Sequence, residues 1–237
     1  MPVTQWMLLS APNTTLRFDM QLTQMLPFIR PNVRLLRLLP LSCLLLTACV
    51  TTSQNTTKGT SSATDSQWKA HQQELSQLRD YQTRGSFAYN GGETKTYAKF
   101  FWQQYTPEKY RLLLTNPLGS RELELTVEPD LARLTTKDGQ THMSDVPNEL
   151  IYQLTGMEIP INDLTAWLTG SPGRATDFTL DENHLLKSVI FENNGEKWQL
   201  NYISYDSKTS PMLPNYLELR QGDRLIKLKM DSWTLKK

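Results

Sequence analysis

Few side chains in this 237-residue chain have the types and spacings that support catalysis or metal binding. The three histidines, His71, His142 and His184, lie far apart and lack the short spacings that metal ligands share. Glu122 and Glu124 stand two residues apart, so both carboxylates share one strand face, where charge is ordinarily solvated. The sequence contains no phosphate-loop, dinucleotide-binding or nucleophile-elbow motif. It therefore predicts no metal, no cofactor and no enzymatic activity.

A cysteine at the end of an apolar run is the residue with the clearest chemical role. Residues 38–49 read "LLPLSCLLLTAC". A helix that spans a bilayer needs about 20 apolar residues, whereas the apolar centre of a signal peptide needs only about 7–15. Arg30, Arg34 and Arg37 precede the run and supply the basic start of such a signal. The run is therefore predicted to belong to a signal peptide.

The last four residues of this run identify the type of signal. Leu46-Thr47-Ala48-Cys49 resembles the lipobox of bacterial lipoproteins, in which the cysteine thiol is alkylated with diacylglycerol and the preceding peptide is removed. Residues 1–48 are thus predicted to be a lipoprotein signal peptide, and Cys49 the lipid anchor. An ordinary secretory signal with a chance cysteine is the alternative. Residues 1–24 are long for a basic leader, which suggests that Met25 is the natural start.

Cleavage before Cys49 would leave 189 residues, enough for one domain with a sizeable core. It would remove four basic residues and one acidic residue, changing the formal net charge from +1 to −2. That charge gives no support to nucleic-acid binding. The mature domain would have no free thiol, because Cys43 leaves with the signal and Cys49 carries the lipid. Val50 is not the Asp that retains enterobacterial lipoproteins in the inner membrane, so an outer-membrane location facing the periplasm is predicted.

The chain after the anchor divides into a tether and one domain. Residues 50–66 are rich in Thr, Ser, Asn and Gly, so residues 49–66 are predicted to be a lipidated, flexible tether. Residues 67–237 are predicted to be a single domain. Apolar residues recur at helical spacing over residues 66–82, which predicts an amphipathic helix capped by Asp65 or Ser66.

Strand patterns fill most of the remaining domain. Apolar and polar residues alternate on both sides of the turn signals at residues 90–92, 138–139, 193–195 and 222–223, as in antiparallel hairpins. Residues 169–177, "TGSPGRATD", are predicted to be a loop. Two short helices interrupt the strands, because apolar residues recur at helical spacing on both sides of Gly156. We expect a mainly β fold, with about ten or eleven antiparallel strands in one curved sheet, closed or nearly so, and the helices on its concave side.

Two apolar features do not fit an ordinary half-buried sheet. The strand segment "KFFW", residues 99–102, is apolar on both faces, so it requires an apolar neighbour on each. The segment "NPLGS", residues 116–120, places Leu118 between turn-forming residues. These residues could present Leu118 at the tip of a loop, but from the pattern alone we expect Leu118 to fold back onto the edge of the sheet.

Several long stretches together resemble the LolB family of outer-membrane lipoprotein receptors, part of the LolA/LolB-like group. These stretches run from Trp68 to Trp233, whereas residues 1–24 have no counterpart. The resemblance includes the lipobox "LTAC". The matching segments of the domain are "QWKAHQQELSQLRDYQTRGSFAY", "YAKFFWQQ", "YRLLLTNPLGSRELEL", "LTGMEIPI", "GRATDF" and "IKLKMDSW". The resemblance implies an incomplete, unclosed antiparallel β-barrel with a lid of short helices.

The resemblance also implies a function. Such a receptor accepts lipoproteins from a soluble periplasmic carrier of similar fold and inserts their acyl chains into the inner leaflet of the outer membrane. The leucine of the protruding "NPLG" loop matters for insertion in that family, so the implied insertion loop is Pro117, Leu118 and Gly119, against the expectation from pattern. The implied acyl-chain cavity is lined by Trp102, Leu150, Ile151, Leu154, Leu164, Trp167 and Leu168.

The competing interpretation is a structural or assembly lipoprotein that uses the curved sheet to dock a protein partner and has no lipid cavity. The "KFFW" strand and the apolar lid helices favour the receptor, since a sheet that only docks proteins would need neither. The expected partners are the periplasmic carrier, the acyl chains of its cargo and the outer-membrane lipid around the anchor. The receptor is expected to be monomeric and to bind no nucleic acid.

Overall fold

The computed structural model describes residues 65–193 and 195–236. The predicted signal peptide, Cys49 and nearly all of the predicted tether lie outside these residues, so the predicted domain boundaries stay predictions. The elements are α1 (Ser66–Leu75), β1 (Tyr81–Gly91), β2 (Thr94–Thr106), β3 (Lys109–Thr115), β4 (Arg121–Glu128), β5 (Leu131–Thr136), β6 (Thr141–Ser144), α2 (Pro147–Thr155), α3 (Ile161–Leu168), β7 (Asp177–Leu180), β8 (Leu186–Asn193), β9 (Glu196–Asp206), β10 (Leu213–Gln221) and β11 (Arg224–Leu235).

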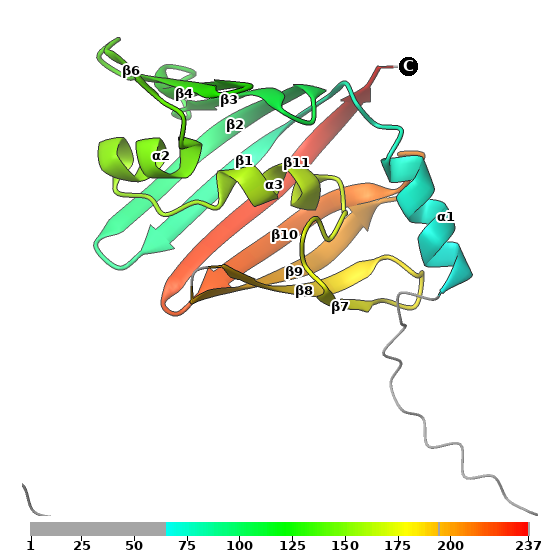
Figure 1. Cartoon of the computed structure of the whole chain (residues 1–237). Helices are drawn as coiled ribbons and strands as arrows, with labels where there is room; N and C mark the ends of the chain where they lie inside the picture. The colour runs from blue at the N-terminus through cyan, green and yellow to red at the C-terminus, as the bar shows by residue number, and fades with distance from the viewer. Residues whose placement is uncertain (1–64, 194, 237) are drawn as a thin grey trace, which may run out of the picture. The chain divides into compact units, whose positions relative to one another are not determined.

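All eleven strands form one antiparallel sheet in the order β6-β5-β4-β3-β2-β1-β11-β10-β9-β8-β7. The first and last strands of the chain, β1 and β11, pair at its centre, and β6 and β7 are its two edges. The sheet curls without closing, and α2 and α3 lie across its concave side (Figure 1). The expected mainly β, unclosed antiparallel barrel with a helical lid is confirmed. Among the described residues, no helix has the length and apolar character needed to cross a membrane.

Period-two alternation positions the core. The inward residues Tyr110, Leu112 and Leu114 of β3 are buried, and the outward residues between them are only half-buried. The same alternation continues through β4, β10 and β11, so the inward faces of all these strands meet in one hydrophobic cluster under the helices. The sequence alternation thus predicts which strand faces are inward.

Two elements differ from the sequence expectation. Helix α1 ends at Leu75 and not near residue 82, because Tyr81 is buried as the first residue of β1 and pairs with both Leu235 and Gln104. Tertiary pairing therefore overrides the helical period there. The predicted loop at residues 169–177 ends in a short edge strand, β7, which pattern alone missed because it has only four residues. The predicted N-cap is confirmed at Asp65, whose carboxylate accepts the backbone N–H groups of Gln67 and Trp68.

The close approach of β1 and β11 depends on one glycine. The register between these strands shifts between Arg84 and Gly85. A Cβ at Gly85 would lie 1.8 Å from the carbonyl oxygen of Lys229 and 2.9 Å from the Cε1 atom of Phe100. A backbone atom cannot move away as cheaply as the end of a side chain, so only glycine fits here.

We expect Gly85→Ala to lower the free energy of unfolding by about 3 kcal/mol, because the added methyl group overpacks the central strand pair. Urea denaturation followed by circular dichroism measures the effect. Ser86→Ala, at the neighbouring outward position, is the matched control and should stay within about 0.5 kcal/mol of the unsubstituted protein. Equal midpoints for the two variants would contradict this account of the β1–β11 contact.

Candidate functional site

The lid is the helical segment α2 and α3 with the residues between them. Its apolar side chains point toward the concave face of the sheet, and α2 packs against β5, β6 and α3. Of the seven predicted cavity residues, six are at most 4% exposed and belong to the single core cluster, while Leu154 is only partly buried against it. The six are Trp102, Leu150, Ile151, Leu164, Trp167 and Leu168. The structure thus brings the predicted residues together between lid and sheet.

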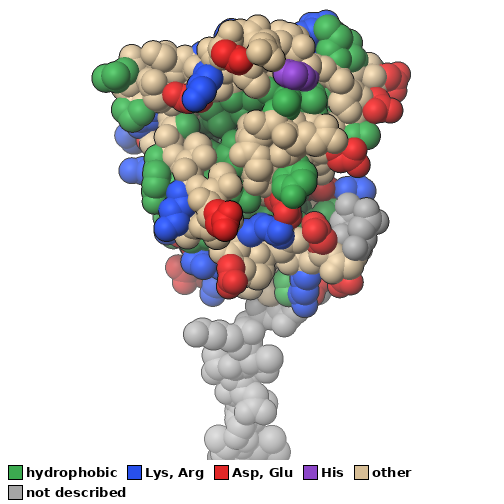
Figure 2. Space-filling model, turned by 90° about the vertical axis from the view of Figure 1, so that its left-hand side faces the viewer, with side chains coloured by type: hydrophobic (Ala, Val, Ile, Leu, Met, Phe, Trp, Pro, Cys, Tyr) green, Lys and Arg blue, Asp and Glu red, His purple; other side chains and the backbone are tan. Residues whose placement is uncertain are grey.

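The space between lid and sheet is occupied by the protein's own side chains in this conformation. Two hollows open at the rim of the lid, with volumes of about 450 Å³ beside α1 and about 710 Å³ along α2 and α3. None of the seven predicted cavity residues lines either of them. An open apolar cavity, as the resemblance implies, therefore requires the lid to move. Figure 2 views the molecule from the end of the sheet where the β1–β2 and β10–β11 hairpins lie. On this side, hydrophobic side chains show in a recess between charged groups of both signs.

Three buried tyrosines hold the lid by its backbone. The Tyr202 hydroxyl on β9 donates a hydrogen bond of 2.9 Å to the Trp167 carbonyl oxygen on α3. The Tyr81 hydroxyl on β1 lies 3.3 Å from the carbonyl oxygen of Thr165. The Tyr89 hydroxyl accepts the backbone N–H of Glu158, between the two helices, at 3.2 Å. Burial raises the pKa of Tyr202 well above its ordinary value, so this phenol stays protonated and can donate.

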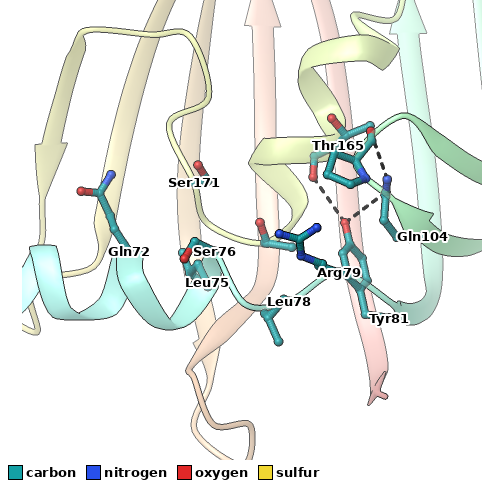
Figure 3. A pocket seen from close by; sticks show the side chains of 11 residues that line it. Gln72, Leu75, Ser76, Leu78, Arg79, Tyr81, Gln104, Thr165 and Ser171 are labelled. Atoms are coloured by element: carbon teal, nitrogen blue, oxygen red, sulfur yellow. Dashed lines mark hydrogen bonds between the residues drawn. The ribbon is translucent and has the colours of Figure 1, made fainter. Parts of the chain in front are cut away.

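Polar side chains line part of the hollow beside α1, near the buried Tyr81 (Figure 3). The side chain of Gln104 is 3% exposed, and its Oε1 atom accepts a hydrogen bond of 2.9 Å from the Trp102 indole N–H. The Tyr81 hydroxyl lies 3.4 Å from the same oxygen. Trp102 in turn stacks on Tyr110, with ring centroids 4.7 Å apart. These contacts fix the indole of Trp102 in one orientation beneath the lid.

Two ion pairs involve residues of the lid, one between its helices and one in the first turn of α3. A guanidinium nitrogen of Arg224 on β11 lies 2.5 Å from a carboxylate oxygen of Glu158. On α3, Asp163 is 8% exposed and accepts hydrogen bonds from Arg174, the closer at 2.9 Å. The polar contacts between the lid and the sheet are therefore few, while the buried side chains of its helices are mainly apolar.

Sequence reasoning missed the polar groups that hold the lid. Tyr81, Tyr89, Gln104 and Tyr202 all occupy inward positions of their strands. A polar atom at an inward position has to find a partner inside, and that was the available signal. The three histidines do not come together, and His184 instead pairs with Asp65 at 2.6 Å. In the described part of the chain, no three His, Cys, Asp or Glu side chains are placed to hold a metal ion.

The loop between β3 and β4 presents an apolar side chain to solvent. Leu118 is 93% exposed, so the expectation from pattern that it folds back onto the sheet edge is wrong. Asn116 organises the loop, because its side-chain oxygen accepts the backbone N–H groups of Leu118 and Ser120, both at 3.0 Å. Gly119 has φ +88°, a conformation that favours glycine. The loop is thus a compact turn with Leu118 at its tip, flanked by Pro117.

The profile of a family described as "Outer membrane lipoprotein LolB" matches residues 79–233. The "Outer-membrane lipoprotein LolB" of Photorhabdus laumondii is 61% identical over 206 residues, which cover 86% of this chain and 98% of the relative. The protein of that name in Serratia proteamaculans is 51% identical over 205 residues, which cover 86% of this chain and 98% of the relative.

The fold is shared with solved structures, among them a putative outer membrane lipoprotein-sorting protein domain from Vibrio parahaemolyticus, with a TM-score of 0.50 and 8% sequence identity. The match covers 72% of this chain and 91% of that domain. At this identity, the likeness concerns the arrangement of the elements alone.

We expect Tyr202→Phe to loosen the lid, because it removes the hydrogen bond from β9 to the Trp167 carbonyl oxygen and leaves only backbone donors at the helix end, such as Gly170, a loss of about 1 kcal/mol. Amide hydrogen exchange in residues 161–168 should become at least about fivefold faster, because exchange there requires the lid to open locally. Tyr205→Phe is the matched control, since its hydroxyl bonds the Leu186 carbonyl within the sheet and not the lid. Equal exchange in α3 for both variants would exclude Tyr202 from holding the lid.

Proposed function

Because the chain belongs to the LolB family of outer-membrane lipoproteins, we propose that it receives the acyl chains of other lipoproteins beneath its lid and inserts them into the inner leaflet of the outer membrane. Its own location is the outer membrane, as a lipoprotein. The observation that carries the proposal is the apolar lid laid over the concave face of an unclosed sheet. The donor is a soluble periplasmic carrier, and the receptor works as a monomer facing the periplasm.

The energetics of an acyl chain support a site of this kind. Burying hydrocarbon contributes about 0.8 kcal/mol per CH₂, so a chain of about 15 methylenes gains on the order of 12 kcal/mol on leaving water. Five lid side chains, Leu150, Ile151, Leu164, Trp167 and Leu168, are at most 4% exposed. Their burial contributes roughly 1.5–3 kcal/mol each, or roughly 8–15 kcal/mol together. When an acyl chain replaces the contacts between lid and sheet, its burial therefore offsets most of the free energy needed to lift the lid.

The direction of transfer follows from affinity. The sequence has no nucleotide-binding motif, so hydrolysis within this chain does not drive the hand-over. The acyl chain instead moves down a gradient of affinity from carrier to receptor to bilayer. A lining of apolar side chains without fixed polar contacts accepts acyl chains regardless of the protein attached to them, which suits a receptor with many cargoes.

The exposed leucine and the anchor supply the contact with the membrane. Leu118, at the tip of its turn, is placed to enter the hydrocarbon boundary as the acyl chain leaves the lid. Cys49 carries the lipid that holds the receptor at the outer membrane. A tether over residues 50–66 reaches on the order of 20 Å, which lets the domain turn its loop to the bilayer. No residue is assigned a catalytic role.

The site beneath the lid can be tested with a brominated fatty acid, because bromine quenches nearby tryptophan fluorescence. We expect the unsubstituted protein to be quenched, and the double variant Trp102→Phe/Trp167→Phe to lose most of that response. Trp233→Phe is the control, since Trp233 lies at the margin of the core beside Tyr81. Denaturation curves establish that the variants fold.

Two results of the quenching measurement would count against the site. Quenching that persists in the double variant would place the acyl chain elsewhere. Absence of quenching in the unsubstituted protein at saturating fatty acid would favour a structural lipoprotein that docks a protein partner on its sheet.

We expect Leu118→Glu to slow lipoprotein transfer from the loaded carrier into liposomes at least about tenfold, because a carboxylate is costly at the hydrocarbon boundary. Folding should be unaffected, since the residue is 93% exposed. Met143→Glu, at a 59% exposed position on the edge strand β6, is the matched control and should transfer normally. Undiminished transfer by Leu118→Glu would remove the loop from the mechanism.

A further inference from the structure

The convex, outward face of the sheet carries a hollow beside the Leu118 loop. Its volume is about 370 Å³. Pro117 of the loop contributes to its lining, so the hollow and the loop are neighbours. The rest of the lining comes from the central strands β1, β2, β10 and β11, and includes Ser86, Ala88, Tyr97, Lys99 and Lys229. None of the lid or cavity residues discussed above is part of it.

Strand register explains why the face is hollowed here. Ser86 lies between Lys99 on β2 and Lys229 on β11, and Lys229 is in turn paired with Tyr216 on β10. In the next row, Ala88 lies between Tyr97 and Lys227. The small side chains of β1 thus form a floor between taller neighbours. Strands lie about 4.8 Å apart, so the lysines across β1 stand roughly 10 Å from one another.

The charges around the hollow are predominantly positive. The outward faces of β1, β2, β10 and β11 carry only two acidic residues, Glu218 and Asp231. Glu218 pairs with Lys227 at 2.9 Å, and Asp231 lies 3.7 Å from Lys99. Lys229 is exposed and has no ion pair with the described residues. The basic residues on these faces are Arg84, Lys95, Lys99, Arg220, Lys227 and Lys229.

The hollow combines this positive charge with apolar and aromatic surface. Tyr97 is 73% exposed, an unusual state for a large aromatic side chain, and Tyr216 borders the same hollow. Tyrosine rings are enriched where membrane meets water, and lysines stretch along apolar surface to reach headgroups. An anionic bilayer surface offers both features, phosphate groups for the lysines and glycerol and acyl-chain boundary for the rings.

We propose that this face, defined by Tyr97, Lys99, Lys229 and Tyr216, docks on the anionic phospholipid headgroups of the bilayer and thereby directs the Leu118 loop toward the hydrocarbon. The inference rests on the proposed function, because it gives that loop an orientation. The docking itself can be measured without any cargo. A basic residue near an anionic surface contributes about 1 kcal/mol, which corresponds to about fivefold in the docked-to-undocked ratio for each lysine.

The test uses the full chain, purified from membranes and reconstituted into phosphatidylcholine vesicles with or without phosphatidylglycerol. An environment-sensitive NBD fluorophore is attached at Tyr97→Cys. The unsubstituted protein, treated with the same reagent, measures the background labelling. A fluorophore at Tyr152→Cys, 52% exposed on the lid side, is the positional control.

We expect the fluorophore at position 97 to shift to the blue when phosphatidylglycerol is present and the one at position 152 to shift less. Added salt should reverse the shift, because it screens the charges. Each lysine contributes about fivefold, so Lys99→Gln/Lys229→Gln should lower the docked-to-undocked ratio by roughly 25-fold. Lys69→Gln, on the exposed side of α1, should leave it unchanged.

A shift at position 97 that ignores phosphatidylglycerol, or that survives the double substitution, would overturn the proposal. Equal shifts at positions 97 and 152 would overturn it as well, since they would report the anchor alone. These results are separate from the proposed function, which fails if the brominated fatty acid does not quench the unsubstituted protein. Loss of docking with intact transfer in Lys99→Gln/Lys229→Gln would likewise reject the directing role of this face.

Discussion

The constraint on which the structure depends is that an unclosed sheet of eleven strands must shield its concave face from water. A closed barrel would fill its interior from its own strands, but here the edges β6 and β7 do not meet. Two short helices supply the missing wall, and side chains such as Ile151 and Trp167 supply the missing volume. The cover is thus a separate piece of chain that contacts the sheet mainly through non-directional apolar packing, which an acyl chain can replace.

The way the lid is attached suits such an exchange. The hydroxyl groups of Tyr81, Tyr89 and Tyr202 bond backbone atoms of the lid, so these hydrogen bonds do not depend on the identity of its apolar side chains. A neutral hydrogen bond contributes only about 0.5–1.5 kcal/mol net, which is small beside the gain from burying one acyl chain. The tyrosines therefore define a closed state that a hydrocarbon ligand can displace. The Leu118 loop, in contrast, is held by Asn116 and needs no movement of the sheet to present its leucine.

Local patterns predicted most of the fold because they report the inward faces of strands directly. Alternation identified Tyr110, Leu112 and Leu114, and helical spacing identified both lid helices. Contacts between distant segments left weaker signals. Gln104 and the lid-holding tyrosines depend on residues far away in the chain, and the exposure of Leu118 depends on the turn that Asn116 builds. The resemblance placed Leu118 at a loop tip where pattern had placed it inside, since pattern carries no information on what a loop faces.

The central claim is that the lid lifts to admit hydrocarbon, and a distance across the molecule tests it most directly. Spin labels at Tyr152 on α2 and Ile203 on the outward face of β9 occupy positions that are 52% and 53% exposed, so they leave the core intact. Pulsed electron paramagnetic resonance then gives their distance distribution with and without a diacylated peptide. Our account predicts a second, longer distance when the peptide is bound. An unchanged distribution with the peptide demonstrably bound would contradict it.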